Sequence, residues 1–223
     1  KRGGFMDRAK IGRNDRIRGS LIAGAIGDAL GYPIEFERNI NERQVSKYIF
    51  DKGIISDDTQ MTLFTANALL WRETRAVLKG IAPPFKEAIY LAYLDWLETQ
   101  TGKKNEKTIS WIKEVPELKE KKAPGNTCLS ALSSGKMGTF EEPINHSKGC
   151  GTVMRIAPIG LSIEDPLTAG KIAREASAIT HGHQLGMIPS DFKAIFINIL
   201  TNEDLPLEES LEKTLKLYAE NSS

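Results

Sequence analysis

The sequence ISDDTQM at residues 55–61, with the apolar segment that follows it to Lys79, decides the fold class. Ser56 suits a helix N-cap, and carboxylates are favoured near the positive end of a helix. Apolar residues then recur at helical spacing, namely Met61, Phe64, Ala68 and Trp71. The pattern predicts a long amphipathic helix from about Asp57 to Lys79.

Two adjacent carboxylates at this helix start, Asp57 and Asp58, have two interpretations. Capping alone accounts well for one of them, because free backbone N–H groups there donate to a carboxylate. A second adjacent carboxylate is repelled unless it is solvated, capped or neutralised by a cation. Hard cations such as Mg²⁺ and Mn²⁺ prefer oxygen ligands of this kind. The stretch is therefore a candidate metal site as well as a cap.

Residues 14–30 precede this stretch and also have helical apolar spacing, with Asn14 as the expected N-cap and Gly31 as the expected end. Asp28 near the helix end is electrostatically unfavourable, which indicates a specific partner. Small residues occupy a second face at intervals of four, namely Gly19, Ala23, Gly27 and Gly31. Such a face permits either close helix packing or the close approach of a ligand.

Glu35 follows the first helix, between an isoleucine and a phenylalanine. A carboxylate with apolar neighbours either faces solvent in an extended segment or points inward, where it needs a partner. A dication needs several oxygen ligands, and one helix start supplies only some of them. We therefore expect Glu35, Ser56, Asp57 and Asp58 to converge on one cavity.

The rest of the chain is also predicted to be mainly helical. Further helices are predicted after Pro83 and Pro84, at 126–134, at 166–180, and from about Pro206 to Tyr218. Residues 36–54 and 99–108 are predicted to be irregular, and no segment alternates as a strand does. The sequence therefore predicts a single all-α domain over residues 1–223, with orthogonal packing rather than a simple bundle.

The composition limits the classes of function. The net charge is +1 and the basic residues are scattered, so the chain has no electrostatic case for binding nucleic acid or an anionic membrane. Two cysteines are too few for a disulfide framework and form no Cys-x-x-Cys zinc pair. No apolar run approaches the roughly 20 residues that cross a bilayer. We expect a cytoplasmic protein.

Two further segments are candidates for ligand binding. Residues 147–155, SKGCGTVMR, form a glycine-rich loop whose N–H groups could face a phosphate. The loop lacks the Walker and Rossmann signatures, and by itself a plain turn explains it better. His181 and His183 lie two residues apart and share no helical face, so joint chelation from a helix is not expected. A histidine at a helix end is often only a cap.

Taken together and in this order, these stretches resemble the ADP-ribosylglycohydrolase family. The matching segments, within about residues 15–190, are RGSL at 18–21, GDALG at 27–31, PIEF at 33–36, SDDTQM at 56–61, PGNT at 124–127, GCGTVMRIA at 149–157 and TH at 180–181. The resemblance implies a compact all-α fold with a binuclear Mg²⁺ or Mn²⁺ centre. It also implies hydrolysis of the bond between C1″ of ADP-ribose and a modified side chain or related acceptor. ADP-ribose or an ADP-ribosylated protein is then the expected partner.

The resemblance also implies roles for individual residues. Glu35, Asp57 and Asp58 correspond to catalytic carboxylates, and these three bind metal together with Ser56, where the family usually has threonine. The glycine-rich loop corresponds to the one that holds the phosphates and ribose of ADP-ribose. The substrate-binding residues implied in this way are Asn126, Ser147, Gly149, Cys150, Gly151, Thr152, Met154 and His181.

One departure from the family pattern leaves two functions open. The family has an Asp-x-Asp-Thr/Ser element near its C-terminus that supplies further metal ligands, and this sequence has none. We therefore expect a domain that is truncated or shortened after about residue 190. Metal-dependent hydrolysis is the first hypothesis, and a non-catalytic ADP-ribose-binding or regulatory module is the second. A purely structural helical domain would leave the acidic pair and the glycine-rich loop without a common purpose.

Overall fold

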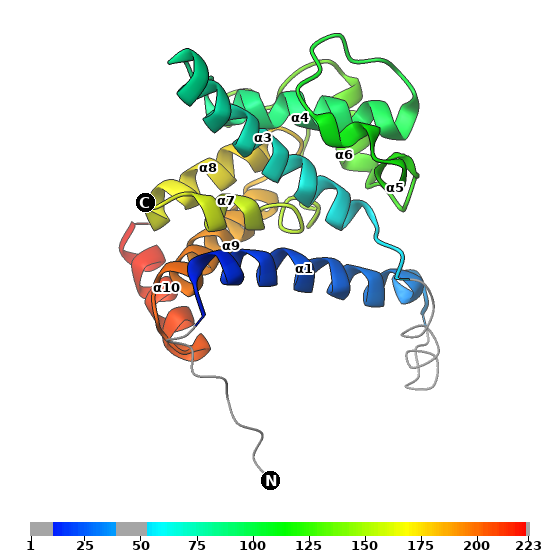
Figure 1. Cartoon of the computed structure of the whole chain (residues 1–223). Coiled ribbons are helices and arrows are strands. Elements are labelled where there is room, and N and C mark those ends of the chain that lie inside the picture. Colours follow the sequence, from blue (N-terminus) through cyan, green and yellow to red (C-terminus); the bar gives the residue numbers. More distant parts are fainter. Residues whose placement is uncertain (1–10, 39–52, 222–223) are drawn as a thin grey trace.

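The computed structural model describes residues 11–38 and 53–221, and over these ranges it contains helices and loops without strands (Figure 1). The helices are α1 (Arg13–Gly31), η2 (Tyr32–Ile34), α3 (Asp57–Lys79), α4 (Phe85–Thr101), η3 (Trp111–Glu114), α5 (Pro116–Lys119), α6 (Asn126–Ser133), α7 (Ala157–Ser162), α8 (Pro166–Ala178), α9 (Gln184–Asn202) and α10 (Leu207–Asn221). The all-α prediction is confirmed. In the described part of the chain, no helix is both long and apolar enough to span a membrane.

The predicted helix over 57–79 is confirmed at both ends. Ser56 is the N-cap of α3 and accepts a hydrogen bond from the Asp58 N–H, while Gly80 ends the helix in the left-handed conformation. A residue without Cβ adopts that conformation without steric cost. The expected core residues Met61 and Phe64 have no exposed surface. This helix therefore joins a buried apolar face to an acidic N-terminal turn.

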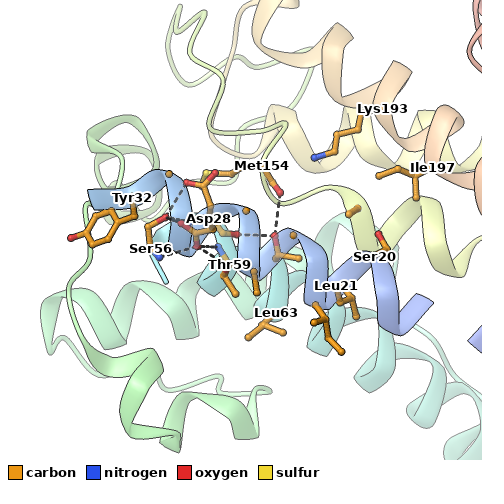
Figure 2. Close-up of a pocket in the computed structure, with 18 of the residues that line it drawn as sticks. Ser20, Leu21, Asp28, Tyr32, Ser56, Thr59, Leu63, Met154, Lys193 and Ile197 are labelled. Carbon is orange, nitrogen blue, oxygen red and sulfur yellow. Dashed lines mark hydrogen bonds between the residues drawn. The ribbon is translucent and has the colours of Figure 1, made fainter. Parts of the chain in front are cut away.

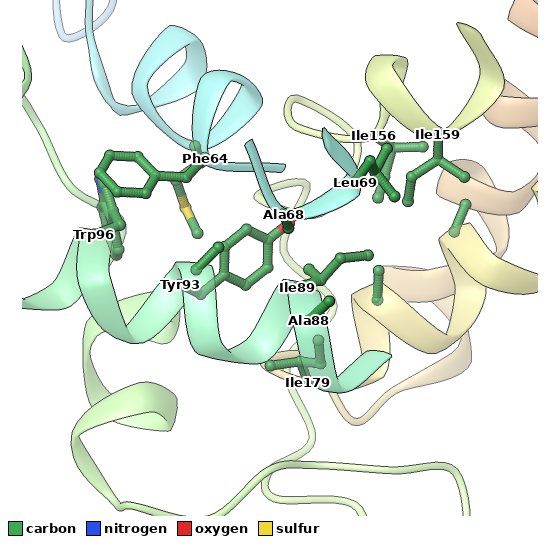
Figure 3. Close-up of a cluster of buried hydrophobic side chains, with 14 of the residues drawn as sticks. Phe64, Ala68, Leu69, Ala88, Ile89, Tyr93, Trp96, Ile156, Ile159 and Ile179 are labelled. Carbon is green, nitrogen blue, oxygen red and sulfur yellow. The ribbon is translucent and has the colours of Figure 1, made fainter. Parts of the chain in front are cut away.

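The hydrophobic core lies around α3, α4, α7 and α8 (Figure 3). Phe64, Tyr93 and Trp96 are fully buried. Their polar atoms are satisfied, because the Tyr93 hydroxyl lies 2.8 Å from the Thr65 hydroxyl and the Trp96 indole N–H donates to Gln60. Buried polar groups that keep their hydrogen bonds avoid a desolvation penalty. The core fixes the start of α3 relative to the rest of the molecule.

α1 departs from the sequence-based expectations. It begins after Gly12 rather than at Asn14, its backbone runs on from Gly31 into η2, and it has no buried residue. Ile22 and Ile26 are more than half exposed. A Cβ on any glycine of the predicted small-residue face would meet nothing within 4 Å. Of the two alternatives left open for this face, close helix packing is not observed among the described residues.

The long helix α9 was not predicted from the sequence. Pro189 lies inside it, and proline removes a backbone donor and normally ends or kinks a helix. The proline falls in the helix's second turn, and α9 goes on for three further turns with Ala194, Ile195 and Ile199 buried. Tertiary burial therefore overrides the local signal here. The remaining predicted helices correspond to α4, α6, α8 and α10 within a few residues.

Candidate functional site

A cavity of about 720 Å³ lies between α1, the start of α3 and α9 (Figure 2). Its polar lining includes three of the four predicted metal ligands together with other polar side chains, namely Glu35, Ser56, Asp58, Asp28, Thr59 and Lys193. Its apolar lining includes Leu21, Leu63, Met154 and Ile197. The predicted convergence therefore holds for Glu35, Ser56 and Asp58. Asp57 does not line this cavity.

Asp28 of α1 caps the start of α3. Its carboxylate accepts bonds from the Ser56 N–H at 2.8 Å and the Ser56 hydroxyl at 2.6 Å. It also accepts bonds from the Thr59 N–H at 3.1 Å and the Thr59 hydroxyl at 2.6 Å. The specific partner predicted from its unfavourable position is thus the buried N-terminus of another helix, where free N–H groups favour a negative charge. Two of these four bonds hold Ser56 in place.

Asp58 and Glu35 face the same cavity and repel each other. Burial is the main cause that raises the pKa of Asp58, and Asp28 raises it further. Burial, Asp58 and Asp28, in that order, raise the pKa of Glu35. Carboxylates whose charged forms are disfavoured by burial and by like charges bind a cation or a proton readily. Hard dications suit such oxygen donors.

Asp57 points to a different part of the site from Asp58. Its Oδ2 accepts a hydrogen bond from the Gly125 N–H at 3.0 Å, just before α6. Burial raises the pKa of Asp57 to about 7; the Gly125 bond opposes this rise, and Asp58 and Glu35 add to it. The acidic pair thus connects the cavity to the α6 region, where the glycine-rich loop also lies.

The glycine-rich loop packs against His181. A Cβ at Gly149 would lie 3.3 Å from the His181 Nε2, and a Cβ at Gly151 would lie 3.4 Å from Cε1 of the same ring. The Gly151 position is also 3.5 Å from the Cys128 Sγ. The Gly149 position is tight for a Cβ, and a Cβ at Gly151 would be in van der Waals contact with the ring and the thiol, so side chains larger than alanine at Gly151 would have to displace one of them. The expected turn is present, since the Val153 N–H donates to the Cys150 carbonyl at 2.9 Å, and the same loop also contacts this histidine.

His181 is buried and hydrogen-bonded on one side. Its Nδ1 lies 2.8 Å from the Thr180 hydroxyl, which in turn accepts a bond from the buried Arg155 at 2.7 Å. Burial, assisted by the Arg155 charge, lowers the pKa of His181 to about 4. The imidazole is therefore neutral at pH 7. Arg155 also lies over the Tyr93 ring at 4.3 Å, which gives this buried cation a partial counter-charge.

The other predicted substrate-binding residues divide into anchored and exposed ones. Ser147 Oγ lies 3.3 Å from the Thr127 hydroxyl, and the Met154 carbonyl accepts from the Thr62 hydroxyl at 3.1 Å. Thr152 donates to the Gly186 carbonyl. The two exposed members are Asn126, at the start of α6, and Cys150, a free thiol. The loop is thus fixed to α3, α6 and α9 while part of its surface stays open.

The carboxylates do not form a compact metal cluster. Among residues 11–38 and 53–221, no group of three or more His, Cys, Asp or Glu side chains is close enough to hold one ion. The donor chemistry of Glu35, Ser56 and Asp58 fits a hard dication. Lys193 of α9, which the sequence did not single out, also lines the cavity. It was missed because α9 itself was not predicted.

Comparison with known proteins agrees with this architecture. No curated protein matches the sequence. The family model described as ADP-ribosylglycohydrolase matches residues 9–223, so the similarity runs past residue 190, where the sequence-based resemblance was expected to end. A match of that extent includes α1, α3, the glycine-rich loop and α9. This chain belongs to the ADP-ribosylglycohydrolase family.

Proposed function

We propose that this protein is a metal-dependent hydrolase that cleaves the glycosidic bond at C1″ of ADP-ribose and releases it from a modified side chain or related acceptor. The observation that supports this most directly is the shared cavity of Glu35, Ser56 and Asp58. Three oxygen donors from two distant segments, with the carboxylates disfavoured as free anions, suit Mg²⁺ or Mn²⁺.

Each part of the site has a role in this proposal. Glu35, Ser56 and Asp58 would hold the cation, with Asp57 joining them on the α6 side. A bound dication would lower the pKa of a water molecule and orient the ribose. The glycine-rich loop and the neutral imidazole of His181 would bind the ADP-ribose moiety by backbone and ring contacts. Cleavage at C1″ requires stabilisation of an oxocarbenium-like transition state, which carboxylates near the ribose provide.

Release of ADP-ribose from a modified substrate tests this proposal. We expect turnover that depends on Mg²⁺ or Mn²⁺, stops in EDTA, and falls by orders of magnitude in Asp57→Ala and Asp58→Ala. Asp165→Ala is the control, because Asp165 is also a carboxylate at a helix start, where it accepts from the Thr168 N–H at 2.7 Å, and it does not line the cavity. Removing a carboxylate from a helix start costs each variant about 1 kcal/mol of stability, so only the site variants should lose activity. Full turnover in EDTA would exclude the metal mechanism.

A non-catalytic ADP-ribose-binding module is the second candidate. It is favoured by the lack of a compact three-residue metal cluster in the described part of the chain. ADP-ribose should raise the melting temperature under either hypothesis, since a ligand that binds only the native state stabilises it. Gly151→Leu should remove this shift because the new side chain would meet His181 and Cys128, whereas Gly19→Leu, in open space, should retain it. Binding without turnover would select the module.

A further inference from the structure

Among the described residues that line the cavity, Lys193 is the one cationic side chain. It points into the cavity from α9, opposite the start of α3 (Figure 2). The carboxylates of Asp28, Glu35 and Asp58 line the same cavity. Asp28 is occupied by four hydrogen bonds from Ser56 and Thr59, so Asp58 and Glu35 are the acids left to interact with a cation.

The Lys193 ammonium group is fixed in position. Its Nζ donates to the Val153 carbonyl at 2.9 Å, next to Met154 in the glycine-rich loop. The side chain is half-buried. Burial lowers the pKa of Lys193, and the charge of Asp58 raises it; the same pair interaction lowers the pKa of Asp58. Within the described residues, Lys193 and Asp58 make no direct ion pair. A further ligand can therefore lie between the two charged groups.

We propose that Lys193 supplies the counter-charge of Asp58 when no divalent cation is bound, and that its ammonium group opposes the entry of a cation into the cavity. The inference rests on the metal site of the proposed function. Its physical basis is that a fixed positive charge near a binding site repels a second one, and more strongly in a partly desolvated cavity than in water. Lys193 is therefore a positioning residue that sets metal affinity and holds the loop, without touching the reacting bond.

Direct Mn²⁺ binding by the protein without substrate tests this inference. Free Mn²⁺ is measured by electron paramagnetic resonance for the wild type, Lys193→Met and Lys193→Gln. We expect both neutral variants to bind Mn²⁺ about five- to tenfold more tightly, because the local repulsion is removed. Lys193→Gln loses the charge but keeps a donor for the Val153 carbonyl, whereas Lys193→Met loses both. Comparing the two variants therefore distinguishes the effect of the charge from that of the loop contact. Lys193→Arg and the exposed Lys171→Met should match the wild type within about twofold.

A second measurement uses no metal. In EDTA, Lys193→Gln should lower the melting temperature, and the loss should be smaller when Asp58→Asn is also present, because the lost attraction is then absent. If the melting-temperature shifts of Lys193→Gln and Asp58→Asn simply add in the double variant, Lys193 is not the counter-charge of Asp58. If the wild type binds Mn²⁺ and the neutral variants bind no more tightly, the inference is overturned and the metal site stands. If no variant binds Mn²⁺, the inference and the metal part of the proposed function fall together.

Discussion

α1 and α3 both provide carboxylates near the cavity, but they are held in opposite ways. α3 buries Met61, Phe64 and other apolar residues in the core, whereas α1 has no buried residue. α1 is attached by hydrogen bonds at its two ends. Asp28 accepts from the start of α3, and Arg13 donates to Asn202 and to the Leu161 carbonyl. The cavity lies between these two attachments. One wall of the site is thus stabilised by apolar packing and the other by hydrogen bonds.

The largest effect should come from the packed helix. Phe64→Ala should lower the free energy of unfolding by about 3–5 kcal/mol, since it removes a fully buried ring and leaves a cavity. Leu70→Ala on the same helix should cost far less, because Leu70 is 67% exposed. Chemical denaturation measures both. A small loss for Phe64→Ala would show that α3 is not the better-packed helix.

The second-largest loss of stability should come from removing the Asp28 hydrogen bonds that link α1 to α3. Asp28→Ala should cost about 2–3 kcal/mol, because four donors at the start of α3 lose a charged acceptor. The amides of Ser56 and Thr59 should then exchange hydrogen faster, while the rest of α3 stays protected. Asp15→Ala in the first turn of α1 is the control, since Asp15 is exposed. Unchanged exchange at Ser56 would break the claim that Asp28 holds this junction.

The burial of Asp57 at the start of α3 also predicts that the free energy of unfolding depends on pH. His181 should produce a dependence of the opposite sign. The native pKa of Asp57 is about 7, above its usual 3.8, so the native state binds more protons and the free energy of unfolding falls as pH rises from about 4 to about 7. The native pKa of His181 is about 4, below its usual 6.5. For His181 the unfolded state binds more protons, and the free energy of unfolding rises over about pH 4 to 6.5.

The contributions of Asp57 and His181 to the slope of unfolding free energy against pH should largely cancel in the wild type. Replacing one residue should reveal the contribution of the other. From about pH 5 to 6.5, stability should fall by about 2 kcal/mol in His181→Asn and rise by about 2 kcal/mol in Asp57→Asn. Urea denaturation at several pH values measures this. Parallel pH profiles for the two variants would contradict the assignment of opposite protonation shifts.

The smallest effect should come from α1 itself. Ile22→Ala should change the free energy of unfolding by no more than about 0.5 kcal/mol, because Ile22 is 60% exposed and no cavity is created. The same denaturation assay as for Phe64→Ala gives a direct comparison. A loss above about 2 kcal/mol would show that this face of α1 is covered in solution, and the contrast between the helices would disappear.

Much of the fold and part of the site could be predicted from local patterns. Apolar spacing gave α3, α4 and α8, and the acidic pair marked the helix start where Glu35 and Asp58 meet. The α9 helix could not be predicted, because Pro189 is a local signal against helix while the burial of its neighbours is a tertiary effect. For the same reason Lys193 could not be placed in the cavity.

The sequence by itself determined the all-α class, the cap at Ser56 and the candidate residues, because propensity, capping and periodicity act between residues close in the chain. Only the tertiary structure decided how those residues are used. It assigned Asp28 to capping α3, turned Asp57 and Asp58 to different sides, and packed Gly151 against His181. It also left α1 without a core face. These outcomes depend on contacts between distant segments, whose geometry no local pattern specifies.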